Sequence, residues 1–236
     1  MPIKLDPQFI SILIIIHAVA GSIALITGPG ALLSMKGGRV HRMFGKLFFI
    51  FMLITGLLAL VVSNLPGHKN FFLFSVGIFS LYMVSSGYRY LALDNLHKGQ
   101  KPATLDWLLT IAMAIFGVIL LVGGILQLCN IYSLGFGNNW FGIVLVVFGF
   151  LGLMMVRDDL KNYRGKVQFR NQFILMHITR MVGANIAAFT AFMVVNNTFL
   201  PAVVAWLSPT VLGIPIIIYW KRKQERIPGM KIEKKD

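Results

Sequence analysis

Cysteine is almost absent from this sequence, since Cys129 is the only one among 236 residues. A single cysteine excludes intramolecular disulfides, thiolate metal clusters and the covalent attachment of a c-type haem. Nor does the sequence contain a nucleotide-binding loop, a metalloprotease helix or a serine-hydrolase elbow. The common hydrolase chemistries therefore have no support in the sequence.

Charge is also scarce, and acidic charge is the scarcer kind. Only 13% of the residues are charged, with eight acidic residues against 22 lysines and arginines, while 57% are hydrophobic. A water-soluble domain of this length does not need so much apolar sequence, and much of it lies in runs that are long enough to cross a bilayer. The composition predicts an all-α, polytopic integral membrane protein.

Seven apolar stretches are candidates for transmembrane helices, and together they predict one seven-helix domain over residues 1–236. A Gly-Pro-Gly break closes the first stretch, and Pro209 and Pro215 should kink the last one. A basic cytoplasmic tail is expected over 221–236. The predicted spans are 9–33, 40–63, 71–93, 105–128, 140–156, 173–196 and 201–220.

The lysines and arginines predict the orientation of these spans. With seven spans, 19 of the 22 fall on one side, Lys4 and Lys69 fall on the other, and Arg180 lies within a span. Basic links mark the cytoplasmic side, so the amino terminus should lie outside and the carboxyl terminus in the cytoplasm. The same rule explains the net charge of +14 without any nucleic-acid partner.

Arg180 stands out because it lies inside the predicted span 173–196, one helical turn after His177. A cation within a span is costly unless it finds a partner or reaches the interface. Small residues on the same helical face, Ala184, Ala188 and Ala191, predict that this face points into the helix bundle. The alternative is that the long side chain of Arg180 snorkels to the interface.

No acidic residue lies at the predicted depth of Arg180. The nearest candidates are the Asp158–Asp159 pair after the fifth span, and Asp94 and Asp106 beside the third and fourth. Without such a partner, an anionic ligand or a lipid head group is the natural counter-ion. Because Arg89 ends a span on the same side, several cations are expected around one pocket that opens to the cytoplasm.

Two histidines on different helices and at similar depth can ligate the iron of a b-type haem from its two sides. His41 and His177 meet this depth test, whereas the levels of His17 and His177 differ by about 12 Å. Nearby arginines would then neutralise the haem propionates. The same residues suit a quinone or a phosphate-bearing head group equally well.

The histidines also have structural explanations, which remain open at this point. His17 lies on a stripe of small residues, where it can simply hydrogen-bond to a neighbouring helix. His41 belongs to a basic cluster that can meet lipid phosphates at the interface. The predicted ligand-binding residues are His17, His41, Arg42, Arg89, His177, Arg180 and Asn185, with His41 and His177 as candidate haem ligands.

Several stretches resemble a family of bacterial multi-helix membrane proteins that is known only as a domain of unknown function. They are HAVAGSIALITGP at 17–29, GGRVHRMFGK at 37–46, HITRMVGANIAAFTAF at 177–192 and WLSPT at 206–210. The first two helices are the most specific part. The resemblance implies a multi-pass protein of the bacterial inner membrane, and it implies no activity.

Two kinds of function fit these observations. The first is a redox module that binds haem b or a quinone in a cationic pocket near the cytoplasmic face. The second is a carrier, binding protein or assembly partner for a small anionic or amphiphilic ligand, which suits the kinked last span and the broken first one. The expected partners are the lipid bilayer and other membrane proteins.

Overall fold

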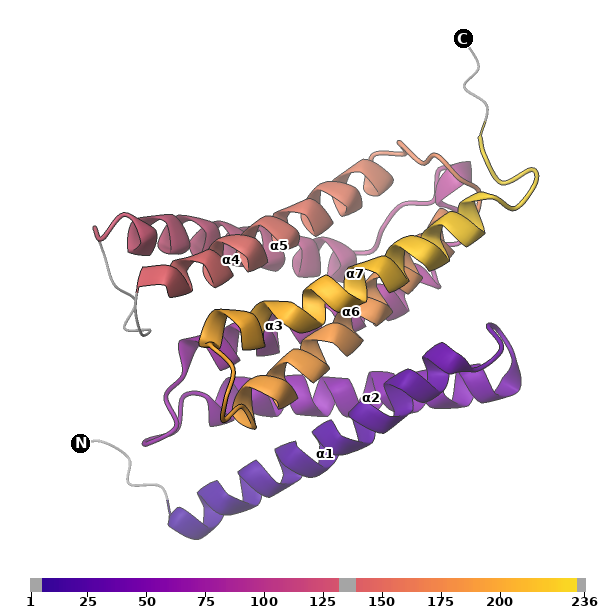
Figure 1. The fold of residues 1–236 in the computed structure, drawn as a ribbon. Helices are drawn as coiled ribbons and strands as arrows, with labels where there is room; N and C mark the ends of the chain where they lie inside the picture. The colour runs from indigo at the N-terminus through magenta and orange to yellow at the C-terminus, as the bar shows by residue number, and fades with distance from the viewer. Residues whose placement is uncertain (1–5, 132–138, 233–236) are drawn as a thin grey trace.

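The structure is a computed structural model that describes residues 6–131 and 139–232. The regular secondary structure of this part of the chain is helical, apart from an isolated antiparallel bridge between Phe169 and Lys231 (Figure 1). Two short 3-10 helices, η1 at Leu96–Lys98 and η2 at Asn139–Phe141, lie beside the long ones. The α-helices are α1 Pro7–Leu33, α2 Arg39–Val62, α3 Phe71–Tyr90, α4 Thr104–Leu128, α5 Gly142–Tyr163, α6 Gln172–Val195 and α7 Ala202–Glu225.

Six of these helices, all except α5, are long and apolar enough to cross a membrane. The all-α fold class is therefore confirmed, and these helices fit the predicted multi-pass membrane protein. Helix α5 starts with an apolar stretch, but its last two turns carry Arg157, Asp158, Asp159 and Lys161.

The helix ends differ from the predicted spans at the basic side of the chain. Helix α5 continues to Tyr163, about two turns beyond the predicted end at 156, because no helix breaker precedes Gly165, whose φ of 73° ends it. Helix α7 likewise continues to Glu225, into the predicted tail. Residues 233–236 of that tail, like Lys4, lie outside the described residues.

Consecutive helices run in opposite directions and form three hairpins, α1–α2, α4–α5 and α6–α7, around α3 (Figure 1). The last turns of α1, α3, α5 and α7 and the first turns of α2, α4 and α6 consequently gather at one end of the molecule. This end also holds the basic links of the sequence, and we call it the basic end.

Helix α3 is the centre of the fold, because more than half of its residues are buried. It packs against α2, α4 and α6. Toward the opposite end, Phe72 of α3 meets Trp206 of α7 and Phe148 of α5, with ring centroids 4.1 and 5.6 Å apart. Such edge-to-face contacts join α3 to the α4–α5 and α6–α7 hairpins through an apolar core.

Candidate functional site

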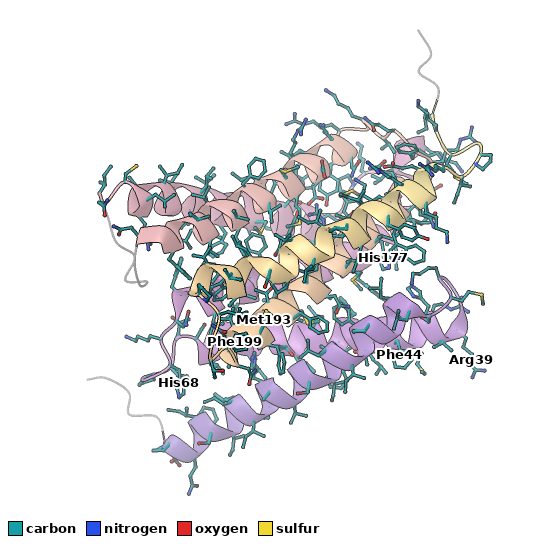
Figure 2. All side chains as sticks on the ribbon, viewed as in Figure 1. Arg39, Phe44, His68, His177, Met193 and Phe199 are labelled. Carbon is teal, nitrogen blue, oxygen red and sulfur yellow. The ribbon has the colours of Figure 1, made fainter. Side chains whose placement is uncertain are left out.

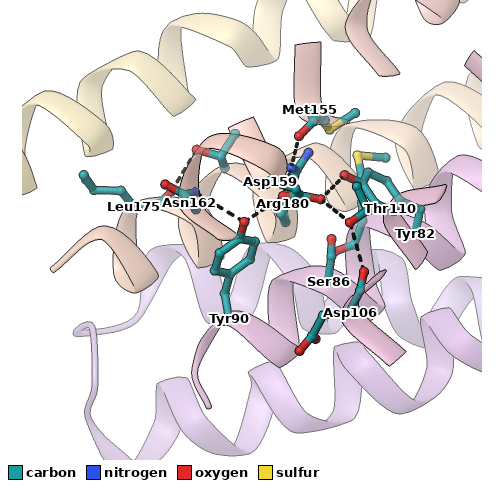
Figure 3. A network of polar contacts seen from close by, with 12 residues as sticks. Tyr82, Ser86, Tyr90, Asp106, Thr110, Met155, Asp159, Asn162, Leu175 and Arg180 are labelled. Atoms are coloured by element: carbon teal, nitrogen blue, oxygen red, sulfur yellow. Dashed lines mark hydrogen bonds and ion pairs between the residues drawn. The ribbon is translucent and has the colours of Figure 1, made fainter. Parts of the chain in front are cut away.

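The Arg180 side chain lies in the protein interior, paired with Asp159 of α5 (Figure 3). Its Nη2 donates to Asp159 Oδ1 at 2.6 Å and to the backbone oxygen of Met155 at 2.7 Å. Both charged side chains have no exposed surface. One of the four predicted acidic candidates is thus the counter-ion, and Arg180 does not snorkel to the interface.

Asp159 accepts three further hydrogen bonds. The hydroxyl groups of Tyr82 and Tyr90 on α3 donate to it at 2.5 and 2.7 Å, and the hydroxyl of Thr110 on α4 donates at 3.0 Å. Asn162 in turn donates to the Tyr90 oxygen at 3.3 Å. This carboxylate therefore joins four helices, and it is saturated by groups of the protein itself.

Arg89 is paired as well, at the start of α4. Its Nε and Nη2 donate to the two oxygens of Asp106 at 2.8 and 2.9 Å, the bidentate geometry in which arginine binds carboxylate best. Asp106 also accepts from the backbone nitrogen of Ala103, which caps the first turn of α4. Arg89 and Arg180 were expected to line a ligand pocket, and both instead tie the α4–α5 hairpin to α3 and α6.

A cavity of about 680 Å³ opens at the basic end, between the α1–α2 hairpin and helices α6 and α7. Its size is within the usual range of small-molecule sites. We call it the basic-end cavity. It is lined by Gly28, Ala31, Leu32, Lys36, Gly37, His41, Arg42, Gly45, Lys46, Phe48, Tyr88, Leu91, Phe173, Ile174, His177, Ile178, Met181, Val182, Asn185, Trp220 and Gln224.

The cavity brings together four of the seven predicted binding residues: His41 and Arg42 from α2, and His177 and Asn185 from α6. Figure 2 shows His177 on α6, with Arg39 and Phe44 on α2 at the same end of the molecule. His17 is not part of the lining. It lies nearer the start of α1, where its Nδ1 bonds to the backbone oxygen of Thr55 of α2 at 3.1 Å, as its structural explanation required.

His41 and His177 are held in the same way. The Nδ1 of His41 lies 2.9 Å from the backbone oxygen of Ala31, and the Nδ1 of His177 lies 2.8 Å from that of Gly87. A carbonyl oxygen only accepts, so Nδ1 carries the proton in each neutral ring and Nε2 keeps its lone pair. No described residue hydrogen-bonds to either Nε2. This is the state in which histidines bind metals.

Gly87 allows α3 and α6 to approach closely enough for the bond to His177. A Cβ at this position would lie 2.8 Å from the Cβ of Arg180 and 3.2 Å from the sulfur of Met181. Any larger residue would push α6 outward. Gly87 thus sets both the orientation of His177 and the depth of Arg180.

Asn185 lies deeper in the cavity, against Gly28 of α1. A Cβ on Gly28 would overlap the amide group of Asn185, so the glycine makes room for this side chain. Asn185 is 9% exposed, and its Oδ1 has no partner in the described part of the chain. A buried acceptor without a partner is costly, which makes it a candidate contact for a ligand.

The charged groups that line the cavity are all cations: Lys36, Arg42 and Lys46. Lys36 Nζ donates to backbone oxygens at the end of α1, including that of Ala31, and lies 4.5 Å from the ring centre of Trp220. The pKa of Lys36 is lowered from the usual lysine value, because the ammonium is partly buried and because Lys223 places a second positive charge nearby. The site therefore attracts negative charge.

Sequence reasoning did not assign Lys36, Lys46 or Trp220 to the site. The two lysines belong to the basic link that was used only for orientation, and their positions five residues before and after His41 are the signal that was available. Trp220 gave no signal, because its place depends on how the end of α7 lies beside the α1–α2 turn.

The donor set restricts what metal group can bind. The described residues contain no cluster of three or more His, Cys, Asp or Glu side chains that could hold a bare metal ion. The cavity offers two imidazoles, which suffice for a metal that brings its own equatorial ligands, as haem does. No protein-family model, curated protein or solved structure matches the chain, so the site itself is the basis for a function.

Proposed function

We propose that this protein is a membrane redox module that would hold one haem b in the basic-end cavity, with His41 and His177 as the residues that bind its iron. The observation that carries the proposal is the matched state of the two histidines. Each donates Nδ1–H to a backbone oxygen, and each ring lines the same cavity with Nε2 left for a metal.

The rest of the cavity fits the same ligand. Phe48, Ile178 and Val182 give it apolar walls for a flat aromatic body. Lys36 and Arg42 supply positive charge for two propionates, and no carboxylate in the lining opposes them. A haem b held by His41 and His177 would supply one-electron transfer.

The protein contributes orientation and charge to this site. The carbonyl oxygens of Ala31 and Gly87 fix the ring planes and the tautomers of His41 and His177. The Arg180–Asp159 pair is neutral as a whole, so it leaves the field of the cavity to the lysines and Arg42. That positive field favours the reduced state of a bound redox group, because reduction adds negative charge.

We also infer that all seven helices cross a bacterial inner membrane, with the amino terminus outside and the basic end in the cytoplasm. The distribution of lysines and arginines supports this orientation. The charges that distinguish α5 from the other helices are at its basic end, and the most buried of them, Asp159, is neutralised by Arg180. Burial of that pair removes the main objection to α5 as a span.

The second candidate is a binding protein or carrier for a small anionic or amphiphilic ligand, such as a lipid-like acid or a quinol. Two observations favour it: the purely cationic rim and the unpaired Oδ1 of Asn185. Neutral His41 and His177 present lone pairs, so they would accept hydrogen bonds from the hydroxyl groups of a quinol. An assembly role within a larger membrane complex is compatible with either ligand.

The absorption spectrum of the detergent-purified protein, before and after dithionite, tests the proposal. Sharp Soret and α bands that respond to reduction are expected, and His41→Ala and His177→Ala should each abolish them. His17→Ala is the matched control, because that ring makes the same kind of bond outside the cavity. A colourless, folded wild-type protein made with adequate haem supply overturns the haem proposal in favour of the second candidate.

A further inference from the structure

A second groove runs along one face of α7, away from the basic-end cavity. The residues that line it recur every three or four positions, so they share one side of the helix. The groove is apolar toward the middle of α7 and cationic toward its C-terminal end. Its lining consists of Pro215, Ile218, Tyr219, Arg222, Lys223 and Arg226.

The three cations of this groove have no counter-ion within the described residues. Arg222, Lys223 and Arg226 are all exposed, and none of them forms an ion pair there. Lys223 lies 5.0 Å from the ring centre of Trp220, which holds it at the side of the helix. Three unpaired cations within about one turn of helix attract a strongly anionic group.

The length of the groove matches one leaflet of a bilayer. From Pro215 to Arg226 the helix rises about 16 Å, at 1.5 Å per residue. Half of a ~30 Å hydrocarbon core is about 15 Å. The cations consequently fall at the level of lipid phosphates, Tyr219 near the interface, and Ile218 and Pro215 beside acyl chains.

We propose that this groove binds one anionic phospholipid of the surrounding leaflet. Its phosphate contacts Arg222, Lys223 and Arg226, and one acyl chain follows Ile218 down to Pro215. A free phosphate ion would use only the cationic half, whereas a phospholipid uses both. The proposal rests on α7 crossing a bilayer, and it does not depend on what the basic-end cavity binds.

Native mass spectrometry of the delipidated, detergent-solubilised protein tests this site with two lipids of identical chains, dioleoyl phosphatidylglycerol and dioleoyl phosphatidylcholine. The wild-type protein should retain the anionic lipid preferentially. Each cation near an anionic surface contributes about fivefold to binding. The triple variant R222Q/K223Q/R226Q should therefore bind phosphatidylglycerol at least tenfold more weakly, with no change for phosphatidylcholine.

The variant R157Q/K161Q/R164Q is the matched control, because it removes three exposed cations from the last turns of α5 and the residue after it, at the same end of the molecule. It should retain the lipid. Ile218→Trp fills the apolar half without changing charge, and it should also weaken phosphatidylglycerol binding. This variant keeps the test open if the triple variant fails to fold.

Three results would overturn the lipid site: equal retention of the two lipids, equal losses in the two triple variants, or full binding by Ile218→Trp. Displacement of the lipid by millimolar inorganic phosphate would also overturn it, since that identifies a site for small anions only. The absorption spectrum separates this proposal from the haem proposal. A colourless wild-type protein contradicts the haem proposal and leaves the lipid measurement unaffected.

Discussion

The guanidinium of Arg180 and the carboxylate of Asp159 lie 2.6 Å apart, with both side chains wholly buried. The ion pair joins the α6–α7 hairpin to the α4–α5 hairpin. It also keeps Arg180, the one cation that the sequence places inside a predicted span, out of the lining of the basic-end cavity. Replacement of one partner should cost about 3–5 kcal/mol, because it leaves the other charge buried alone.

The charge pairing of Arg180 and Asp159 can be tested by a double-mutant cycle. Arg180→Met and Asp159→Leu should each lower the thermal unfolding temperature strongly, and the double variant should be more stable than either single one. Thermal unfolding in detergent measures this. If the losses of the single variants simply add in the double variant, the two charges do not stabilise each other.

The pair Arg89–Asp106 should behave asymmetrically. The Arg89 side chain is 31% exposed and Asp106 is 1% exposed, so loss of the arginine is partly compensated by water. Arg89→Gln should cost roughly 1 kcal/mol. Asp106→Ala should cost more, because it also removes the cap on Ala103. Equal losses in the same unfolding measurement would contradict the capping role.

Gly87 does not line the basic-end cavity, but Gly87→Ala should shift His177, which does. The added methyl group meets Arg180 and Met181, and the outward shift of α6 should weaken the bond from His177 to the Gly87 oxygen. We expect a stability loss of about 1–3 kcal/mol together with a lower haem content. Gly21→Ala is the control, because Gly21 lies outside the cavity lining and a Cβ there would make only ordinary contacts, 3.6 Å from Thr55 Cγ2. Similar haem content in both variants would exclude a positioning role for Gly87.

The lowered pKa of Lys36 predicts that ligand binding depends on pH. Its lowered pKa means that it loses its positive charge at a lower pH than an ordinary lysine. Affinity for ferric haem, added to the haem-free protein, should fall as the pH rises through that pKa. Lys36→Arg keeps the charge, so its affinity should persist to higher pH. Identical pH profiles of the wild type and Lys36→Arg would show that Lys36 does not contact the ligand.

The helical class and the involvement of His41, Arg42, His177 and Asn185 in one cavity could be predicted from the sequence. Both predictions rest on apolar runs and on helical spacing, which are patterns of neighbouring residues in the sequence. The partner of Arg180 could be narrowed only to four acidic residues. Asp159 is the partner because α5 remains helical past its apolar stretch. Asp159 therefore lies on the side of α5 that faces α6.

The cations that line the basic-end cavity were harder to predict from the sequence. Arg89 and Arg180 were natural candidates because they lie at or within spans, and the structure gives both a carboxylate. Lys36 and Lys46 lie on the cavity instead, because the α1–α2 turn folds toward α7. Which cations are free depends on pairing between distant helices, and no local pattern records it.

The position of Asp159 before Arg180 in the chain has a consequence for biosynthesis. The two residues are 21 positions apart, and α5 is made first. At about 5–20 residues per second, Asp159 waits roughly 1–4 s for its partner. In the proposed seven-span topology, the end of α5 is a poor transmembrane segment during that interval, because the charge that neutralises Asp159 arrives only with α6. On this topology α5 and α6 have to be inserted together, as a pair of helices. A chain that stalls between them leaves the carboxylate of Asp159 without its counter-ion, which marks the chain for quality control.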